Sequence, residues 1–284
     1  MATLKEIKKR VGSAKTVHKI TRAMKLVSAS KARAAQIANG VSKPYSDRIY
    51  SLVRDLWTIT DPKAHPLLKS NNSGRHCYLI ITSDKGLCGS LIDNMEDFLL
   101  NEKVFDTKNS QFIMIGKRGA EMIMKRGAAP SAVFDLGLRK PTFEFASPII
   151  KLITRGYLNN DFGAVTIFYT SFVNSFKQVP EKRIILPALI PSKDSKPTDI
   201  AIYEPDADKV LESLIPRYLQ IQLYQLLLES VACEHSARMV AMDKATNNAQ
   251  EIIDELTLVY NKVRQEKITR ELLEITTTIS ALKS

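Results

Sequence analysis

The sequence predicts an α/β protein in which a long antiparallel coiled coil of the N- and C-terminal helices flanks an inserted Rossmann-like α/β domain. Apolar residues repeat with heptad steps of three and four at both ends of the 284-residue chain. Between these ends, short apolar runs alternate with helical stretches. We therefore expect an N-terminal coiled-coil helix in residues 1–60, a central α/β domain in residues 61–205 and a C-terminal coiled-coil helix in residues 206–284.

The N-terminal helix is expected to open with a capping box at residues 3–6 (TLKE), which indicates a structural helix rather than a cleaved targeting segment. A single amphipathic surface helix is the simpler alternative, but the helical pattern continues through residues 46–57. Gly40 and Pro44 predict a kink or break. The predicted apolar seam has two parts separated by a three-residue skip: Leu4, Ile7, Val11 and Ala14, then Val17, Ile20, Met24 and Val27.

The middle of the chain has the pattern of a mostly parallel sheet. Buried strands are predicted at residues 76–82, 111–115 and 164–169. Helices are predicted at residues 90–100, 117–126 and 142–153, and a hairpin at residues 174–186. Residues 187–205 are polar and rich in proline, which is typical of a connector.

The C-terminal segment is predicted to be one long helix. From Asp208 onward it has no glycine, and Pro216 is its only proline. About 65 residues of helix would be roughly 100 Å long, which no compact domain of this size needs. The apolar seam that favours a coiled coil is Ile252, Leu256, Val259 and Val263, followed by Ile268, Leu272, Ile275, Ile279 and Leu282.

Charge is distributed unevenly along the chain, whose net charge is +11. Residues 1–34 contain ten basic side chains and one acidic one, whereas residues 206–284 contain 12 acidic and nine basic ones. This asymmetry indicates an acidic partner. Residues 1–44 contain no Phe, Tyr or Trp to stack on bases, so a protein with acidic loops fits better than a nucleic acid.

Catalytic and cofactor sites are not predicted. The glycine-containing turns at residues 83–90 and 116–119 follow strands, but they lack the spacing and the Lys-Ser pair of a phosphate-binding loop. Cys77, Cys88 and Cys233 form no zinc motif, and a reduced intracellular compartment is their simplest interpretation. The four histidines share no metal-binding spacing with a carboxylate.

Four stretches resemble the γ subunit of F-type ATP synthase, especially its bacterial members. They are residues 19–31 (KITRAMKLVSASK), 82–90 (TSDKGLCGS), 234–242 (EHSARMVAM) and 258–275 (LVYNKVRQEKITRELLEI). The resemblance covers nearly the whole chain in order. Pro216 and residues 277–279 (TTI) depart from the family pattern, and the cysteine-bearing insertion of chloroplast members is absent.

The resemblance implies a rotor shaft that performs no chemistry and needs no cofactor. Its expected partners are the ring of α and β subunits, the ε subunit and the c-subunit ring, with δ, a and b in the whole complex. It implies a peripheral location on the cytoplasmic face of a bacterial inner membrane, or alternatively on the matrix side of a mitochondrial one. By resemblance, the rotor–stator contacts are Met24, Lys25, Arg264, Gln265, Thr269 and Glu271.

Two other classes of function remain open from the residues alone. A basic coiled coil that binds nucleic acid would show a steep salt dependence of binding to duplex DNA. A nucleotide-dependent enzyme would bind ATP or a dinucleotide as an isolated chain, which the missing phosphate fingerprint argues against.

Overall fold

A computed structural model describes residues 3–60, 65–71, 73–105, 110–137, 141–188 and 203–283, with side-chain surroundings to residue 278. Two helices are far longer than the others: α1 (Leu4–Ile59) and α5 (Ala207–Lys283). The chain divides into two compact units. The coiled-coil unit comprises Met1–Ser28 with Met239–Ser284, and the sheet unit comprises Ala29–Arg238.

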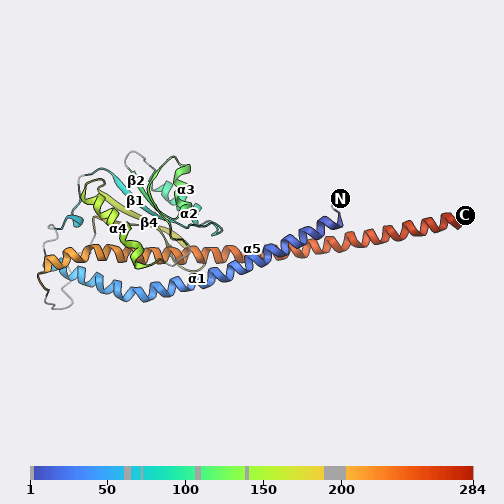
Figure 1. The fold of residues 1–284 in the computed structure, drawn as a ribbon, viewed down its shortest axis with the longest axis horizontal. Coiled ribbons are helices and arrows are strands. Elements are labelled where there is room, and N and C mark those ends of the chain that lie inside the picture. Colours follow the sequence, from blue (N-terminus) through green and yellow to red (C-terminus); the bar gives the residue numbers. More distant parts are fainter. Residues whose placement is uncertain are drawn as a thin grey trace. The chain divides into compact units, whose positions relative to one another are not determined.

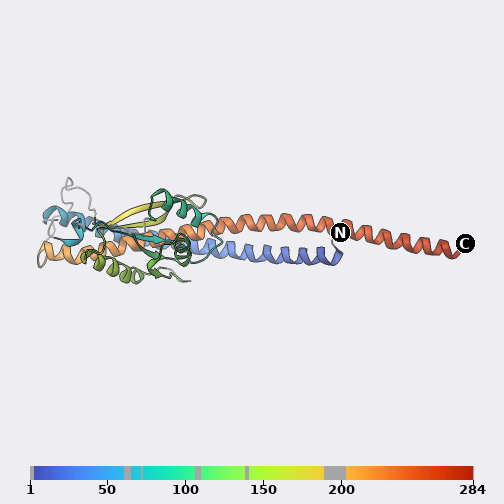
Figure 2. The ribbon, with the colours of Figure 1, turned by 90° about the horizontal axis from the view of Figure 1, so that it is seen from above.

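The coiled-coil unit pairs the start of α1 with the second half of α5 in antiparallel orientation (Figures 1 and 2). Thr246 Oγ1 donates a hydrogen bond to Thr21 Oγ1 at 2.9 Å, and Lys25 Nζ lies 2.5 Å from Asp243 Oδ1. The predicted capping box is confirmed. The backbone N–H of Thr3 donates to Glu6 Oε2, and the N–H of Glu6 donates to Thr3 Oγ1.

The buried face of α1 differs from the predicted seam. The heptad steps continue without a skip, and the residues that they place on the inner face are Leu4, Ile7, Val11, Ala14, His18, Thr21, Lys25 and Ser28. Three of the four residues in the second predicted part are wrong, because Val17, Ile20 and Val27 are 50%, 54% and 56% exposed, whereas Met24 is partly buried. Small and polar side chains allow close helix packing here, so hydrophobicity alone selected the wrong face.

The predicted C-terminal seam is also only partly correct. Leu256 and Val263 lie partly buried, but Ile252 and Val259 are exposed, and Ile253 and Tyr260 take their places. Every side chain from Arg264 to Thr278 is exposed. The physical reason is register. Because Thr21 lies opposite Thr246, antiparallel pairing places the beginning of α1 near Val263, and α5 continues beyond it as a single helix. Ile279 and Leu282 lie outside the residues whose side chains are described.

The sheet unit contains a five-stranded sheet in the order β3-β2-β1-β4-β5. Its strands are β1 (His76–Ile81), β2 (Ser110–Ile115), β3 (Pro130–Phe134), β4 (Ala164–Phe172) and β5 (Gln178–Leu186). The first four are parallel, with His76 beside Ser110 and Ala164, and β5 closes an antiparallel hairpin with β4. The expected parallel sheet is therefore confirmed. Residues 174–186 do not form a hairpin by themselves, because they contain the turn and the single strand β5 that pairs with β4.

Helices cover both faces of this sheet, as Figure 1 shows for the short helices. They are α2 (Leu91–Asn101), α3 (Lys117–Lys125) and α4 (Phe143–Leu158), with a 3-10 turn at Pro66–Leu68. Alternate strand residues face opposite sides. Ile80, Met114 and Phe168 pack with α2 and α3, whereas Leu79 and Ile167 pack with α4 and with the α1 and α5 segments of this unit.

Three local predictions met different outcomes. The three expected helices match α2, α3 and α4 within a few residues. The predicted kink or break at Gly40 and Pro44 is not a break, because α1 continues through both, as α5 does through Pro216. Pro44 forfeits one helical hydrogen bond, but burial of Ile49, Val53 and Leu56 after it stabilises the continued helix. The connector at residues 187–205 lies mostly outside the described residues.

Candidate functional site

Two of the six predicted contact residues lie on α1 in the coiled-coil unit. Met24 is partly buried. The Lys25 side chain, 40% exposed, is paired with Asp243 of α5. The ion pair holds the ammonium group beside the partner helix and still leaves it open to solvent. An exposed pair of this kind contributes only about 0–1 kcal/mol to stability, so it positions Lys25 more than it stabilises the fold.

The other four residues lie on the part of α5 that has no partner helix. Arg264, Gln265, Thr269 and Glu271 are all exposed. Glu271 pairs with Lys267 one turn earlier at 3.4 Å, whereas Arg264 and Gln265 make no hydrogen bond or ion pair with any described residue. Arg264 and Gln265 directly follow Val263, where the buried coiled-coil seam ends. They are therefore available to a partner.

A second group of polar residues surrounds the loop that follows β1. Leu87 and Gly89 have positive φ angles of 63° and 62°, and α2 begins two residues later. Asp84 fixes the start of this loop by accepting hydrogen bonds from the N–H groups of Lys117 and Gly137, at 3.1 and 2.9 Å. The expected tight strand-to-helix turn is confirmed, and the Asp84 side chain ties it to the segments that contain Lys117 and Gly137.

Asp84 is one of three charged groups at the carboxyl ends of β1, β2 and β3. Lys117 Nζ lies 2.6 Å from Asp135 Oδ2 and holds the pKa of Asp135 at about 2. Burial, followed by a hydrogen bond with Asp135, raises the pKa of Asp84. Lys117 supplies the positive charge that a bound cation would otherwise supply to Asp84 and Asp135. The three residues therefore hold three loops together and have a structural role.

The sequence did not predict the group on α5 that meets this loop. Arg238 Nη2 lies 2.8 Å from Glu234 Oε1, and their side chains are 8% and 14% exposed. The same guanidinium donates to the carbonyl oxygens of Lys85 and Gly86 at 3.1–3.2 Å. The i,i+4 spacing of Glu234 and Arg238 was the available signal, but it could not reveal backbone carbonyls distant in the sequence.

His235 completes this group. Its Nδ1 accepts a hydrogen bond from Arg238 Nη1 at 3.2 Å, which requires a neutral ring with its proton on Nε2. Burial, together with the charges of Arg238 and Lys31, lowers the pKa of His235 to about 4. Between about pH 4 and pH 6.5, the imidazole of His235 is therefore neutral in the folded chain but protonated in the unfolded chain.

This difference in pKa predicts that acid destabilises the sheet unit through His235. The contribution to stability is fully present above about pH 6.5 and is lost as the pH falls toward 4. Urea unfolding at pH 7 and pH 5 should show a smaller drop for His235→Gln than for the parent. Burial raises the pKa of Glu234, which acts in the opposite direction, so the comparison must be made between variant and parent. Equal drops would contradict the prediction.

The cysteines have the environment of structural residues. All three are free and buried. Burial raises the pKa of Cys77 to about 12 and also raises those of Cys88 and Cys233. A thiol with a raised pKa is a poor nucleophile. Cys233 instead donates a weak hydrogen bond to the carbonyl oxygen of Thr170 at 3.3 Å.

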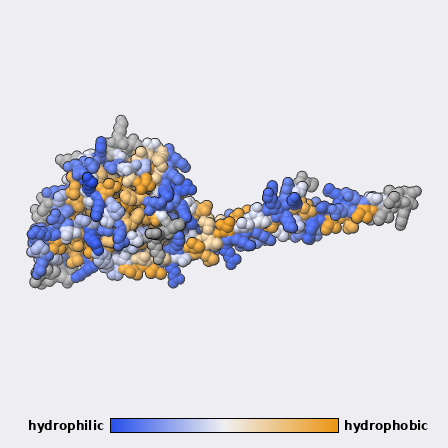
Figure 3. Space-filling model, in the orientation of Figure 1, coloured by the Kyte–Doolittle hydropathy of each residue, from blue (hydrophilic) through white to orange (hydrophobic). Residues whose placement is uncertain are grey.

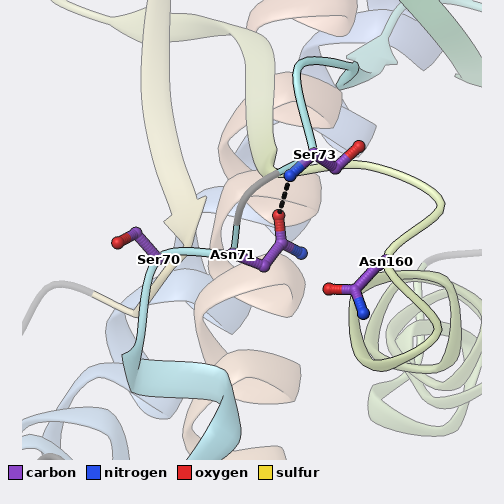
Figure 4. Close-up of a pocket in the computed structure, with 4 residues that line it drawn as sticks. All are labelled: Ser70, Asn71, Ser73 and Asn160. Carbon is purple, nitrogen blue, oxygen red and sulfur yellow. Dashed lines mark hydrogen bonds between the residues drawn. The ribbon is translucent and has the colours of Figure 1, made fainter.

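Several hollows lie on the surface of the sheet unit. One of about 510 Å³ is lined by Ser70, Asn71, Ser73 and Asn160, all uncharged (Figure 4). Asn71 Oδ1 accepts the Ser73 N–H and so is occupied by its own loop. Within the described ranges no three metal-binding side chains gather, and no helix has an apolar stretch long enough to cross a bilayer.

Comparisons with known proteins cover the whole chain. The profile of the ATP synthase family matches residues 3–282. The ATP synthase gamma chain of Herpetosiphon aurantiacus is 38% identical over 295 aligned residues, covering 99% of both chains, and that of Bdellovibrio bacteriovorus is 35% identical, covering 100% of both. A chain of the Euglena gracilis mitochondrial ATP synthase superposes with a TM-score of 0.71 at 18% identity, covering 98% of this chain and 94% of its own. The chain belongs to the ATP synthase gamma-chain family.

Proposed function

We propose that this chain is the central rotor shaft of an F-type ATP synthase, coupling ion flow through the membrane sector to ATP synthesis or hydrolysis on the catalytic subunits. The observation that carries the proposal is family membership over residues 3–282. Solved relatives include the rotor of the Euglena gracilis enzyme and the central stalk and c-ring of the Tetrahymena thermophila enzyme. The driving ion is a proton or a sodium ion.

The end of α5 supports this role physically. Ile268, Leu272, Leu273 and Ile275 are 49–59% exposed on a single helix, and Figure 3 shows apolar and polar side chains alternating along it. A lone helix with this much exposed apolar surface is stabilised when a partner covers it. A ring that encloses the helix covers all its sides, whereas a flat partner would cover only one.

Charge supports the same partner. The α1 segment carries ten basic residues within residues 1–34, and most of its lysines and arginines are exposed. Acidic loops on the catalytic subunits would attract this surface over distances up to about a Debye length. Met24 and Lys25 are the contacts that we propose for these loops. Arg264, Gln265, Thr269 and Glu271 are those that we propose for the inner wall of the ring.

The proposed mechanism is conformational. The shaft meets each catalytic subunit with a different face, so rotation shifts each site between states of different nucleotide affinity. Because coupling free energies are reciprocal, ion-driven rotation yields ATP and hydrolysis drives reverse rotation. The chain itself performs no catalytic step in this proposal. Residues 1–60 and 206–284 form the shaft, and residues 61–205 form a foot that binds the ε subunit and the c-ring. The assembly sits on the cytoplasmic face of a bacterial inner membrane, or on the matrix side of a mitochondrial one.

Isolation of the assembly tests this proposal. A tagged copy of the chain, expressed in its host, should co-purify with α and β subunits in a complex that contains one copy of this chain per ring. Native mass spectrometry gives the stoichiometry. Recovery of the chain alone, or with nucleic acid, would contradict the proposal.

The isolated chain should not bind ATP with useful affinity. The loops after β1 and β2 lack a phosphate-binding fingerprint. In addition, the Asp84 carboxyl already accepts the N–H of Lys117 at the start of α3. Isothermal titration calorimetry of the purified chain with Mg-ATP should give no measurable heat of binding, and micromolar affinity would disprove this prediction.

A further inference from the structure

The crevice at the carboxyl ends of β1 and β4 is the place where an α/β sheet of this topology normally holds a ligand. The strand order β3-β2-β1-β4-β5 puts β2 and β4 on opposite sides of β1. From β1 the chain adds β2 and then β3 on one side of β1. It then crosses back and adds β4 on the other side of β1. Open α/β sheets bind their ligands at this switch point.

In the sheet unit, one stretch of α5 contacts both sides of this switch point. At the end of β4, Glu229 Oε1 accepts the N–H of Phe172 at 2.9 Å and the hydroxyl of Ser171 at 3.0 Å. After the end of β1, the Arg238 guanidinium donates to the carbonyl oxygens of Lys85 and Gly86. Nine residues of helix separate the two anchors, a distance of about 14 Å.

The Arg238 anchor is strongly directional. Its side chain is only 8% exposed, and two backbone carbonyls, Glu234 and His235 satisfy the buried guanidinium. Hydrogen bonds from a guanidinium are charge-assisted and fix the geometry of their acceptors. Apolar packing is non-directional by comparison. The polar anchors therefore define the rotation and axial position of α5 against the sheet in a way that packing alone does not.

We propose that Arg238 and Glu229 form a latch by which the α/β domain holds its own helix α5 in the crevice where related folds hold a ligand, and that this latch transmits torque between shaft and foot. The latch rests on the proposed rotor function. Arg238 is a positioning residue in this scheme. It acts through the loop at residues 83–89 and touches no nucleotide. Without the latch, α5 turns or slides relative to the sheet under load, and hydrolysis proceeds with less ion pumping.

The latch can be tested with Arg238→Gln in the assembled complex. Loss of the charge-assisted bonds should speed amide hydrogen exchange in residues 83–90 by roughly 10- to 150-fold. In membrane vesicles, the number of ions pumped per ATP hydrolysed should fall. Glu229→Ala should lower the same ratio by releasing the other anchor. Lys151→Gln, which removes an exposed cation from α4 in the same unit, is the matched control and should match the parent in both measurements.

The outcomes separate the latch from the rotor function. A parent chain that assembles and pumps supports the rotor function whatever the variants do, and a parent chain that does neither contradicts it. Unchanged exchange and unchanged pumping ratio in Arg238→Gln would overturn the latch alone, as would faster exchange with an unchanged ratio. If Arg238→Gln fails to assemble, Arg238→Lys carries the test, because an ammonium keeps the charge but loses the forked geometry. If the latch exists, Arg238→Lys pumps fewer ions per ATP hydrolysed than the parent does.

Discussion

Replacing Arg264 and Gln265 together with leucine should lower the ATPase turnover or the yield of assembled complex, while the isolated chain still folds. Both side chains are exposed on α5 just beyond the coiled-coil seam and have no described partner within the chain. A hydrogen bond to the Arg264 guanidinium is worth about 1.5–3 kcal/mol. If the bond is stronger in one rotary state than in another, its loss slows turnover by at most roughly 10- to 150-fold, and solvent exposure reduces this effect.

The test compares assembly, ATPase rate and ATP-driven ion pumping in membranes with those of the parent. Lys262→Leu combined with Glu266→Leu is the matched control. This control also introduces two leucines, so the added apolar surface is the same. Positions 262 and 266 lie one turn apart on the side of the helix opposite Arg264. We expect a smaller effect from the control. A solvated Arg264 would change stability by no more than about 0.5 kcal/mol and would not change the rate. Parental values in all three measurements would remove these residues from the contact surface.

Gly116→Ala should cause a large loss of stability in the sheet unit. Gly116 joins β2 to α3 with φ 102° and ψ 132°, a region that side chains other than hydrogen avoid. A Cβ atom there would lie 2.3 Å from the carbonyl oxygen of Thr82 on the neighbouring strand's end. Backbone strain and overpacking together should lower the free energy of unfolding by about 2–6 kcal/mol. Thermal unfolding of the isolated chain measures the loss.

Gly127→Ala provides the matched control for that substitution. Gly127 also has a positive φ, 79°, but no atom lies within 4 Å of a Cβ built there. Its loss should therefore be limited to backbone strain of about 1–2 kcal/mol. The difference between the two variants isolates the steric contact between β2 and the end of β1. Equal losses would show that the close approach to Thr82 contributes nothing.

The periodic parts of the fold were predictable from the sequence, but the exact face of the coiled coil was not. Heptad steps are visible at both chain ends because a long helix repeats its signal many times. The inner face of α1 is made by Ala14, Thr21 and Ser28 rather than by Val17 and Val27. Hydrophobicity favours valine for burial, whereas close approach of two helices favours small side chains. This choice depends on the partner helix, which a single helix's sequence does not contain.

The sequence also failed to predict one short strand and the contacts between residues far apart in the chain. Strand β3 has only five residues at the edge of the sheet, and it begins at Pro130, so it lacks the apolar run that revealed the other parallel strands. The Arg238 contacts could not be predicted, because their acceptors are backbone carbonyls of Lys85 and Gly86, which any residue type provides. The six contact residues followed from resemblance alone. The four on α5 are exposed, whereas Met24 and Lys25 on α1 are partly buried.

Observation of rotation in single complexes tests the rotor function most directly. The chain's three cysteines are all buried, so an introduced cysteine at Lys125, an exposed position on α3, can be labelled selectively with a bead. With the catalytic ring fixed to a surface, addition of ATP should turn the bead in one direction in discrete steps, and removal of ATP should stop it. A bead that stays still while the same complexes hydrolyse ATP would contradict the account.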